Sequence, residues 1–400
     1  MIHVCYGLYD KDGRYSKFTG TSILSMFENT GAEITVHILH DNTLSADNRQ
    51  NFLTIAKKYN QRINFHNVEE SCAKEIAELR NKLGRIEKYA YSIGALYRFL
   101  IIQSIREEKI IYLDADTIID LDIDELWQIE LGDKPLAVVA EVDNLCRMPE
   151  YRVANTVKRE DYFNSGVMLM NLKVLRNELE NLWQGINFVA ENSHLTLLDQ
   201  DVFNYCYATR ALKLPVKFNL MIGEARLHGA FEARNKICHY ITKSLTLNLR
   251  DDANHMWMEY FSKTPWFTPE VMLRIYDLIQ ELHAQAQDKL LQLSAIMSGR
   301  HRIFFTELTN LDRFKQLFYV NPTEEIIDAT KPNALNSLLE KMIENRGEEF
   351  LILLVNRYSE VAQVLTRTGF AEGLDFINAT DFLSYKHGMP LDTNFLIRAI

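Results

Sequence analysis

The sequence lacks the features of a membrane-embedded or disulfide-stabilised protein. No segment of the 400 residues approaches 18 uninterrupted apolar residues, so we expect no membrane-spanning helix. The first residues show neither the charged leader nor the apolar run of a signal peptide. The five cysteines are odd in number and scattered without a CxxC pair, which argues against a disulfide framework and a structural zinc site. Reduced thiols in a cytoplasmic protein are therefore the expectation.

Glycine-rich phosphate loops and an excess of positive charge are missing too. There is no GxGxxG after the first predicted strand and no GxxxxGK[ST] anywhere, which excludes the usual dinucleotide and P-loop sites. The formal net charge of −10 argues against nucleic acid or an anionic membrane surface as the main partner. A nucleotide would have to be held by loops at strand ends, with a metal neutralising its phosphates.

The sequence does contain an alternation of short apolar strands and amphipathic helices. Strands are predicted at 3–8, 33–40 and 63–68, with helices from the turn at 10–13 to about 29, at 47–59 and at 97–105. Such strand–helix–strand units give right-handed crossovers and a largely parallel sheet. With 47% apolar residues, a chain of this length is expected to form two domains.

The most informative stretch is the apolar run 110–113, which ends in Asp114 and Asp116. Ligands of open α/β sheets bind just beyond the carboxyl ends of strands, and these acids occupy such an end. A buried carboxylate without a compensating charge is costly, and hard divalent cations prefer oxygen ligands. The pair therefore predicts a cation site.

Three later stretches also set polar residues into apolar runs. They are 161–172 with Asn164 and Ser165, 198–204 with Asp199 and Gln200, and 236–241 with His239. Together with the Asp-Ala-Asp motif, these ordered motifs resemble the retaining glycosyltransferases of family 8, which include bacterial galactosyl- and glucosyltransferases and glycogenin. Asp10, Tyr97-Arg98 and the segment 256–265 add to the likeness, which covers roughly residues 1–265.

The resemblance implies an α/β fold of GT-A type that binds a UDP-sugar through Mn²⁺ or Mg²⁺. It implies Asp114, Asp116 and His239 as metal ligands, a reasonable set for Mn²⁺, and Asp199 and Gln200 as catalytic residues. The donor-binding residues it implies are Asp10, Arg98, Asp114, Ala115, Asn164, Ser165, Asp199, Gln200 and Lys243. Since Gln200 is a poor nucleophile, we expect retention by attack of the acceptor hydroxyl on the face from which UDP departs.

One motif departs from the family pattern. The family usually continues its histidine as HxxGxxKPW, with the lysine reaching the diphosphate. Here the run is His239-Tyr-Ile-Thr-Lys-Ser-Leu245, with no glycine and with leucine in the place of that lysine. Neither Lys243 nor Arg250 lies at the sequence position of the family's lysine.

Beyond residue 265 the pattern changes. Thr268-Pro269 is typical of a helix start, and the helix is predicted to run to about 297. Short strands at 303–305, 324–328, 349–355 and 374–378 alternate with helices at 334–345 and 358–368. We therefore expect a catalytic domain at 1–265, a helical connector at 266–300, and a C-terminal α/β domain at 301–400 that resembles small Rossmann-like modules. Acceptor recognition or homodimerisation is its expected role.

Structural explanations compete for several of these residues. His239 could be a core histidine, Asp10 and Asn164 could be turn residues, and Arg98 could pair with Asp114. Two other functions remain open. A haloacid-dehalogenase-type phosphohydrolase has a similar DxD strand end, although its threonine would lie one place later. A catalytically silent UDP-sugar-binding module would share the donor site.

The function that the sequence favours is transfer of a hexose from a UDP-sugar to a hydroxyl group. The hexose would be glucose or galactose, with or without an N-acetyl group. The acceptor would be a surface glycan, a lipid-linked sugar or a glycoprotein. We expect a bacterial, cytoplasmic enzyme that can work peripherally at the inner face of the membrane.

Overall fold

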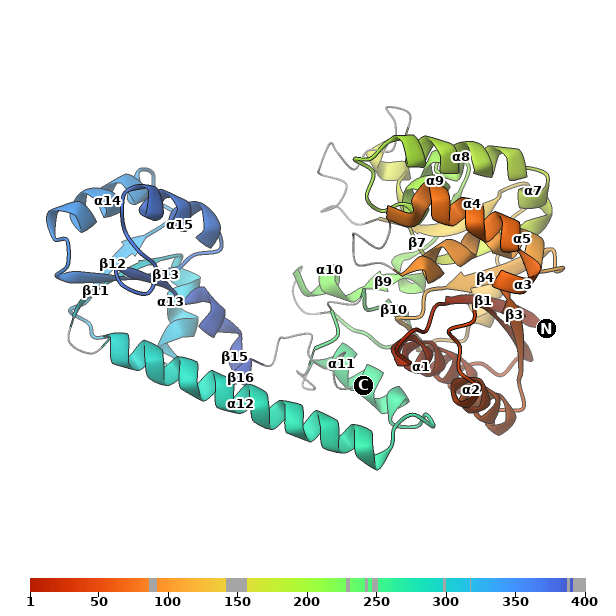
Figure 1. Cartoon of the computed structure of the whole chain (residues 1–400), viewed down its shortest axis with the longest axis horizontal. Coiled ribbons are helices and arrows are strands. Elements are labelled where there is room, and N and C mark those ends of the chain that lie inside the picture. Colours follow the sequence, from red (N-terminus) through yellow and green to blue (C-terminus); the bar gives the residue numbers. More distant parts are fainter. Residues whose placement is uncertain are drawn as a thin grey trace. The chain divides into compact units, whose positions relative to one another are not determined.

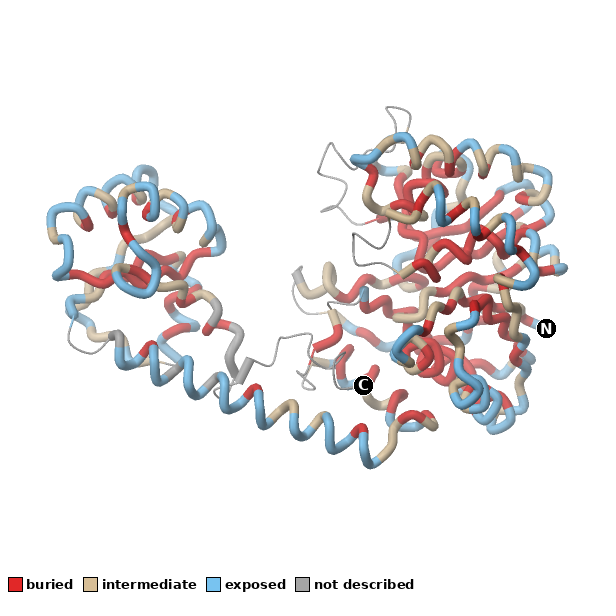
Figure 2. The backbone as a smooth tube through the Cα atoms, in the orientation of Figure 1, coloured by how far each residue is buried: buried red, intermediate tan, exposed pale blue. Residues whose placement is uncertain are grey.

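The computed structural model describes residues 1–85, 92–141, 157–227, 231–241, 244–246, 251–297, 300–316, 318–386 and 389–390. The contacts of the chain divide it into two compact units, one built on Met1–Met272 and one that begins at Leu273 (Figure 1). Each has buried strands inside and exposed helical faces outside (Figure 2). The separate functional boundaries at 265 and 300 stay a prediction.

The first unit is organised around a mostly parallel seven-stranded sheet in the order β3-β2-β1-β4-β7-β6-β8. Strand β1 pairs in parallel with β2 and β4, whereas β7 runs antiparallel to both β4 and β6. This agrees with the expected α/β fold. The strands are β1 (Ile2–Leu8), β2 (Ile34–His40), β3 (Arg62–Asn67), β4 (Lys109–Leu113), β6 (Leu136–Ala140), β7 (Phe163–Asn171) and β8 (Leu212–Lys213).

Helices cover both faces of this sheet. On one face, α4, α5, α8 and α9 join the buried residues of β1, β4 and β7 in a continuous core. The helices of the first unit are α1 (Arg14–Asn29), α2 (Ala46–Lys58), α3 (Val68–Ser71), α4 (Ala73–Leu83), α5 (Ile101–Ser104), α6 (Asp124–Trp127), α7 (Leu172–Arg176), α8 (Leu179–Glu191), α9 (Asp199–Tyr207), α10 (Ile222–Leu227) and α11 (Asp252–Phe261). Helices α4 and α8 and strand β6 are not among the elements predicted from the sequence.

The helix predicted at 97–105 is mostly a 3-10 helix and not an α-helix. It begins earlier, as the 3-10 helix η2 (Ile93–Leu100), and becomes α-helical only at α5. Here the backbone of η2 lies directly against β1, since a Cβ atom on Gly7 would come within 2.6 Å of the carbonyl oxygen of Gly94. Two further 3-10 turns, η5 (Arg159–Asp161) and η6 (Val216–Phe218), lie in loops.

A small second sheet lies beyond the end of β4. It has the order β5-β10-β9, formed by β5 (Thr117–Ile119), β10 (Ile237–His239) and β9 (Leu220–Met221). Strand β10 is antiparallel to β5, and His239 pairs with Thr117. The chain therefore returns after more than a hundred residues to lie beside the acidic turn that follows β4.

The second unit begins within α12 (Pro269–Met297) and holds a four-stranded parallel sheet in the order β12-β11-β13-β14. One core packs α13 and the end of α12 on one face, and another packs α14 and α15 on the other. The remaining elements are β11 (His301–Thr306), α13 (Leu308–Lys315), β12 (Glu325–Asp328), α14 (Ala334–Glu344), β13 (Glu349–Leu354), α15 (Tyr358–Arg367), β14 (Phe376–Asn378), η7 (Thr380–Ser384), β15 (Tyr385–Lys386) and β16 (Met389–Pro390). The expected alternation is present, with α13 as an addition.

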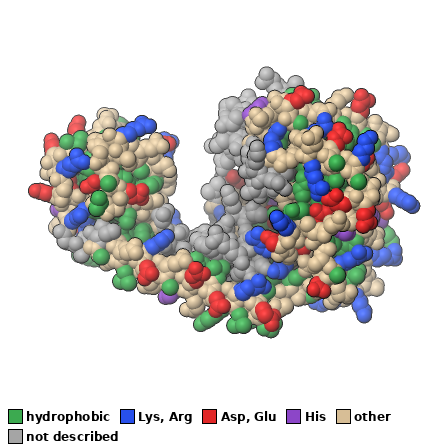
Figure 3. Space-filling view, in the orientation of Figure 1, with side chains coloured by type: hydrophobic (Ala, Val, Ile, Leu, Met, Phe, Trp, Pro, Cys, Tyr) green, Lys and Arg blue, Asp and Glu red, His purple; other side chains and the backbone are tan. Residues whose placement is uncertain are grey.

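The charges on the surface and the cysteines do not point to a particular partner. On the face shown in Figure 3, Lys and Arg side chains are interspersed with Asp and Glu. Cys5, Cys72, Cys206 and Cys238 are free thiols, and Cys146 lies outside the described residues. Within the described part of the chain, no helix combines the length and apolar character that a membrane crossing requires.

Candidate functional site

The site is built on the turn that joins the main sheet to the small one. Strand β4 is buried and ends at Leu113, and the amide of Asp114 donates to the carbonyl of Gly166 in β7 at 2.8 Å. The carbonyl of Asp114 accepts from the Thr117 hydroxyl at 2.8 Å. These bonds close a tight turn that projects Asp114 and Asp116 from the carboxyl end of β4.

His239 joins this turn from β10. Its Nε2 lies 3.3 Å from Oδ1 of Asp116 and 3.8 Å from Oδ2 of Asp114. Its Nδ1 lies 3.1 Å from Oδ1 of Asn219, which can only accept, so Nδ1 carries the proton and Nε2 faces the acids. The three ligand atoms lie within 4.8 Å of one another, a spacing that could hold a metal ion.

Gly166 makes this approach possible. A Cβ atom there would lie 2.3 Å from Cε1 of His239 and 2.9 Å from Oδ2 of Asp114. Real Cβ atoms do not approach other atoms so closely, so a side chain at this position would push the histidine and the acid apart.

Arg98 lies behind the acids, buried in η2. Its Nη2 donates to Asp114 at 2.7 Å and its Nη1 lies 2.9 Å from Oδ2 of Asp199. Nη1 also donates to Ser165 Oγ at 2.9 Å. Burial acts to lower the pKa of Arg98, but the charges of Asp114 and Asp199 overcome it and raise that pKa. The guanidinium thus remains charged and links two carboxylates from distant segments.

A buried amide network connects β7, β6 and α9. Gln200 Oε1 accepts from the Asn164 side chain and from the Ser165 amide, both at 3.1 Å. Gln200 Nε2 donates to Oε2 of Glu141 at 3.0 Å, and Asn164 donates to the same oxygen at 3.1 Å. Glu141 directly follows β6. The network fixes the orientation of Gln200 before any ligand binds.

Asp199 opens helix α9 after a strained residue. Leu198 is buried and has φ 31° and ψ −83°, a conformation that is rare for a residue with a side chain. Such strain costs about 1–3 kcal/mol and is concentrated at functional sites. Burial raises the pKa of Asp199, and the charge of Arg98 opposes that rise.

These side chains surround a cavity of about 190 Å³. Its lining includes four carboxylates, those of Asp114, Asp116, Glu141 and Asp199. Among the described residues that line it, Arg98 is the one Lys or Arg side chain. Four carboxylates with one guanidinium leave an excess of negative charge, which is costly at buried positions. A bound cation would offset that excess charge.

Of the residues predicted from sequence, the structure brings Arg98, Asp114, Ala115, Asp116, Asn164, Ser165, Asp199, Gln200 and His239 to this cavity. Asp10 is not among its lining residues. Its carboxylate accepts from the Ser16 amide at 3.0 Å and from Asn48 Nδ2 at 2.8 Å, which holds the start of α1. Its nucleotide-binding role stays a prediction.

The loop that departs from the family pattern is partly described. Lys243 lies outside the described residues. Leu245, in the place where the family has lysine, is fully buried and has no positive charge to offer a phosphate. Ile241 lines the cavity with a positive φ of 24°.

Two residues of the site, Glu141 and Asn219, were not predicted from the sequence. Glu141 follows an apolar strand, the same signal that identified Asp114, and could have been found. Asn219 orients His239 and donates to Asn164 Oδ1 at 2.8 Å. It precedes a two-residue strand, β9, and has no motif around it.

Comparison with known proteins identifies the family. Residues 8–244 match the model of glycosyl transferase family 8. The chain is 26% identical over 286 residues to an Escherichia coli lipopolysaccharide 1,2-glucosyltransferase, covering 66% of this chain and 79% of that protein. It is 24% identical over 225 residues to a Salmonella typhimurium lipopolysaccharide 1,3-galactosyltransferase, covering 54% and 63% of the two chains.

A crystal structure of a galactosyltransferase with donor and acceptor sugar analogues has a similar fold. The TM-score is 0.53 at 19% identity, over 67% of this chain and 98% of that one. This likeness agrees with a GT-A-type α/β fold. The family match decides against the phosphohydrolase alternative. Because the matched residues form more than half of the chain, this protein belongs to glycosyl transferase family 8 and is a glycosyltransferase.

Proposed function

We propose that this enzyme transfers a hexose from a UDP-sugar, bound through a divalent cation, to a hydroxyl of a glycan, glycolipid or glycoprotein acceptor. The observation that carries the proposal is the cluster of Asp114, Asp116 and His239 in the wall of the cavity that also holds Asp199 and Gln200.

The ligand set suits Mn²⁺ or Mg²⁺. Two carboxylates and one imidazole, with its other nitrogen held by Asn219, match the ligand types and the outer hydrogen bond that such ions use. When bound, the cation would act as a Lewis acid toward the negative charge of the diphosphate. The cavity supports this, because Arg98 is already paired with two acids and leaves little positive charge for phosphates. Lys243 is a second candidate for the diphosphate.

The donor sugar would occupy the part of the cavity between β7 and α9. Ser165, Asn164 and Arg98 offer polar atoms to its hydroxyls, and Ala115 leaves room beside the acidic turn. Asp199 and Gln200 would stabilise positive charge on the sugar ring as the bond to UDP breaks. Asp10 is assigned to the nucleoside on the family resemblance.

The transfer is proposed to retain the configuration of the sugar. The acceptor oxygen bonds to C1 as the C1–O bond to the diphosphate breaks, and UDP leaves with the bonding electrons. The acceptor proton passes to the departing phosphate oxygen on the same face. Gln200 cannot act as a strong nucleophile, and its amide oxygen already accepts two hydrogen bonds.

The relatives support a hexose donor. The two named above are a glucosyltransferase and a galactosyltransferase of lipopolysaccharide, and these names are the basis for proposing glucose or galactose here. The same relatives support a surface-glycan or lipid-linked acceptor, and a glycoprotein acceptor is proposed on the family resemblance. Acceptor recognition or dimerisation through residues 301–400 remains a proposal.

A donor panel tests the proposed function. Release of UDP would be measured from UDP-glucose, UDP-galactose and their N-acetylated forms, with Mn²⁺ and with a chelator, in wild type and in Asp133→Ala as a control. Asp133 is exposed and lies outside the cavity lining. We expect Mn²⁺-dependent release from one donor and a product that retains the donor's configuration. No release from any of these donors with Mn²⁺ would contradict the proposed donor and metal dependence.

A further inference from the structure

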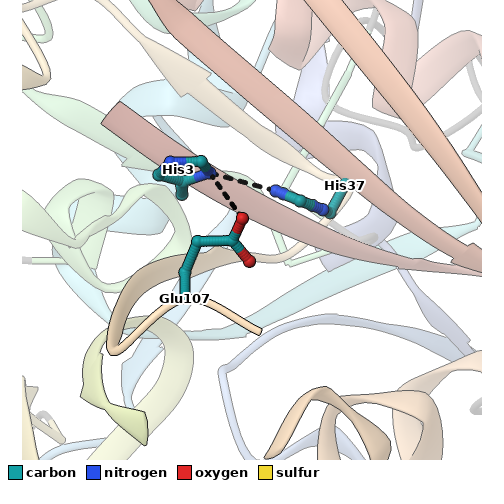
Figure 4. Close-up of side chains that lie close together, drawn as sticks. All are labelled: His3, His37 and Glu107. Atoms are coloured by element: carbon teal, nitrogen blue, oxygen red, sulfur yellow. Dashed lines mark hydrogen bonds and ion pairs between the residues drawn. The ribbon is translucent and has the colours of Figure 1, made fainter. Parts of the chain in front are cut away.

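A second group of metal-ligating side chains lies on the same sheet, away from the active site. His3 of β1, His37 of β2 and His66 of β3 project from one face, because Cys5 pairs with His37 and Leu39 pairs with His66 in the parallel register. Glu107, in the loop before β4, points its carboxylate at His3 and His37 (Figure 4). This loop is separated from Asp114 by the whole of β4, whose five residues span roughly 16 Å at the rise of an extended strand.

The distances match those of a metal site. Nδ1 of His3 lies 3.2 Å from Nε2 of His37 and 3.7 Å from Oε1 of Glu107. All three ligand atoms lie within 4.8 Å of one another. Two ligands on a tetrahedral ion with bonds of about 2.0–2.1 Å are separated by about 3.3 Å. Small movements of the Glu107 side chain, which is 31% exposed, would complete such an arrangement.

The single proton between His3 Nδ1 and His37 Nε2 would have to move to the other nitrogen of its ring for both atoms to ligate an ion. Burial lowers the pKa of His37 to about 4 and also lowers the pKa of His3, so both rings are neutral at pH 7. Burial acts to raise the pKa of Glu107, but backbone hydrogen bonds and the two histidines bring it below its usual value.

His66 supplies the outer contact. Its Nε2 lies 3.0 Å from Nδ1 of His37, and the two rings stack with centroids 5.2 Å apart. If Nδ1 of His37 donates to His66, Nε2 of His37 presents its lone pair to the ion. Ligating histidines commonly have such a partner on the second nitrogen, which fixes the ring and the tautomer. His66 is thus a positioning residue.

We propose that His3, His37 and Glu107 bind a divalent transition-metal ion of the Zn²⁺ type, in a site separate from the active site. Two imidazoles and one carboxylate are a known zinc ligand set, with water in the fourth position. His3 is 17% exposed, which leaves a side from which the ion and the water can enter. The ion would tie the loop before β4 to strands β1 and β2 and so stabilise the sheet.

The test uses an Asp116→Ala background, so that the active-site cluster is disabled. After treatment with a chelator, Zn²⁺ binding would be measured by equilibrium dialysis in this background and with Glu107→Gln, His37→Ala or His194→Ala added. His194 is exposed and belongs to neither of the two groups of potential metal ligands found among the described residues, so it is the histidine control. Glu107→Gln preserves the side-chain shape if His37→Ala fails to fold.

We expect one equivalent of Zn²⁺ in the background and with His194→Ala, and at least 10-fold weaker binding with Glu107→Gln. Co²⁺ in the same site should give the strong visible absorption of a tetrahedral complex, and Zn²⁺ should raise Tm. No Zn²⁺ binding in the background would overturn the proposal, as would equal binding after Glu107→Gln and His37→Ala. Either result would leave the three histidines as a hydrogen-bonded row.

Discussion

The main sheet has a candidate metal cluster at each end of β4, and the two differ in chemistry and surroundings. At the carboxyl end, two carboxylates and one imidazole lie in the wall of a cavity with further acids. At the amino end, two imidazoles and one carboxylate lie on the sheet face outside that cavity. Oxygen-rich ligands favour Mn²⁺ or Mg²⁺, whereas paired imidazoles favour Zn²⁺.

The histidines of the two clusters are held in opposite electrostatic states. Burial acts to lower the pKa of His239, but Asp116 and Asp114 outweigh it and the pKa is raised. Burial dominates at His37, where the pKa falls to about 4. The comparison teaches how the surroundings set the charge of an imidazole: neighbouring carboxylates raise the pKa of His239, whereas burial without an equal opposing charge keeps His37 neutral.

The sharpest separation of the two clusters is expected from Asp116→Ala. It removes one ligand from the acidic cluster without touching His3, His37 or Glu107. Since loss of mere outer-shell partners reduces metal affinity or activity about 10–100-fold, loss of a ligand should reduce Mn²⁺-dependent turnover more than about 100-fold. Steady-state UDP release with saturating Mn²⁺ measures this. Turnover equal to that of the wild type would show that Asp116 is not a metal ligand.

Gly166→Ala should damage the acidic cluster by crowding. The new methyl would lie 2.3 Å from the His239 ring, and overpacking of this kind costs about 1–3 kcal/mol. We expect a lower Tm together with weaker Mn²⁺ binding, measured by thermal unfolding and calorimetry. Gly31→Ala is the matched control, since a Cβ there meets no atom within 4 Å. Equal behaviour of the two variants would show that the close approach of β7 to His239 is not required.

Asp201 allows a structural carboxylate to be distinguished from a metal ligand. It accepts from the Tyr162 hydroxyl at 2.8 Å and from the Leu197 amide at 3.0 Å, and burial raises its pKa to about 7. Between about pH 4 and pH 7, Asp201 therefore keeps its proton in the folded state, whereas in the unfolded state, with a pKa near 3.9, it has released it. This stability is fully present below the unfolded pKa and is lost as pH rises through the folded one.

The free energy of unfolding should thus fall by about 2 kcal/mol from this group as pH rises from 5 to 7. Denaturant unfolding at several pH values would measure the difference between wild type and Asp201→Asn. That difference should change with pH over this interval, and Mn²⁺ binding should persist in the variant. A pH-independent difference would mean that Asp201 is ionised in the fold throughout.

The smallest effects should come from the outer partners, and they should be selective. Asn219→Ala removes the acceptor of His239 Nδ1 and should weaken Mn²⁺ binding about 10-fold, with little change in Zn²⁺ binding. His66→Ala removes the partner of His37 and should do the reverse. Competition with a metal-sensitive dye would measure both affinities. If both variants weakened both ions alike, the two sites would not be independent.

The two clusters also explain what could be predicted from the sequence. Asp114 and Asp116 are two residues apart at the end of an apolar run, so local sequence contains their signal. Strand alternation predicted the α/β fold for the same reason. His3, His37 and Glu107 have no shared motif, and only the parallel register of β1 with β2 and the return of the chain before β4 bring them together.

Other differences follow from tertiary contacts. The 3-10 winding of η2 lies against Gly7 of β1, which a periodicity rule cannot anticipate. The Asp10 carboxylate is held by hydrogen bonds from Ser16 and Asn48. Asn48 belongs to no recognisable motif, so this contact could not be predicted from the sequence. Arg98 was expected near the donor, and its two carboxylate partners, Asp114 and Asp199, come from segments 85 residues apart.

Calorimetry of UDP binding tests the central claim most directly. Titrations would compare wild type with and without Mn²⁺, and Asp116→Ala with Mn²⁺. The metal-dependent donor site predicts binding to wild type that requires Mn²⁺ and is lost in the variant. Absence of binding in wild type with Mn²⁺, or equal binding after Asp116→Ala, would contradict it.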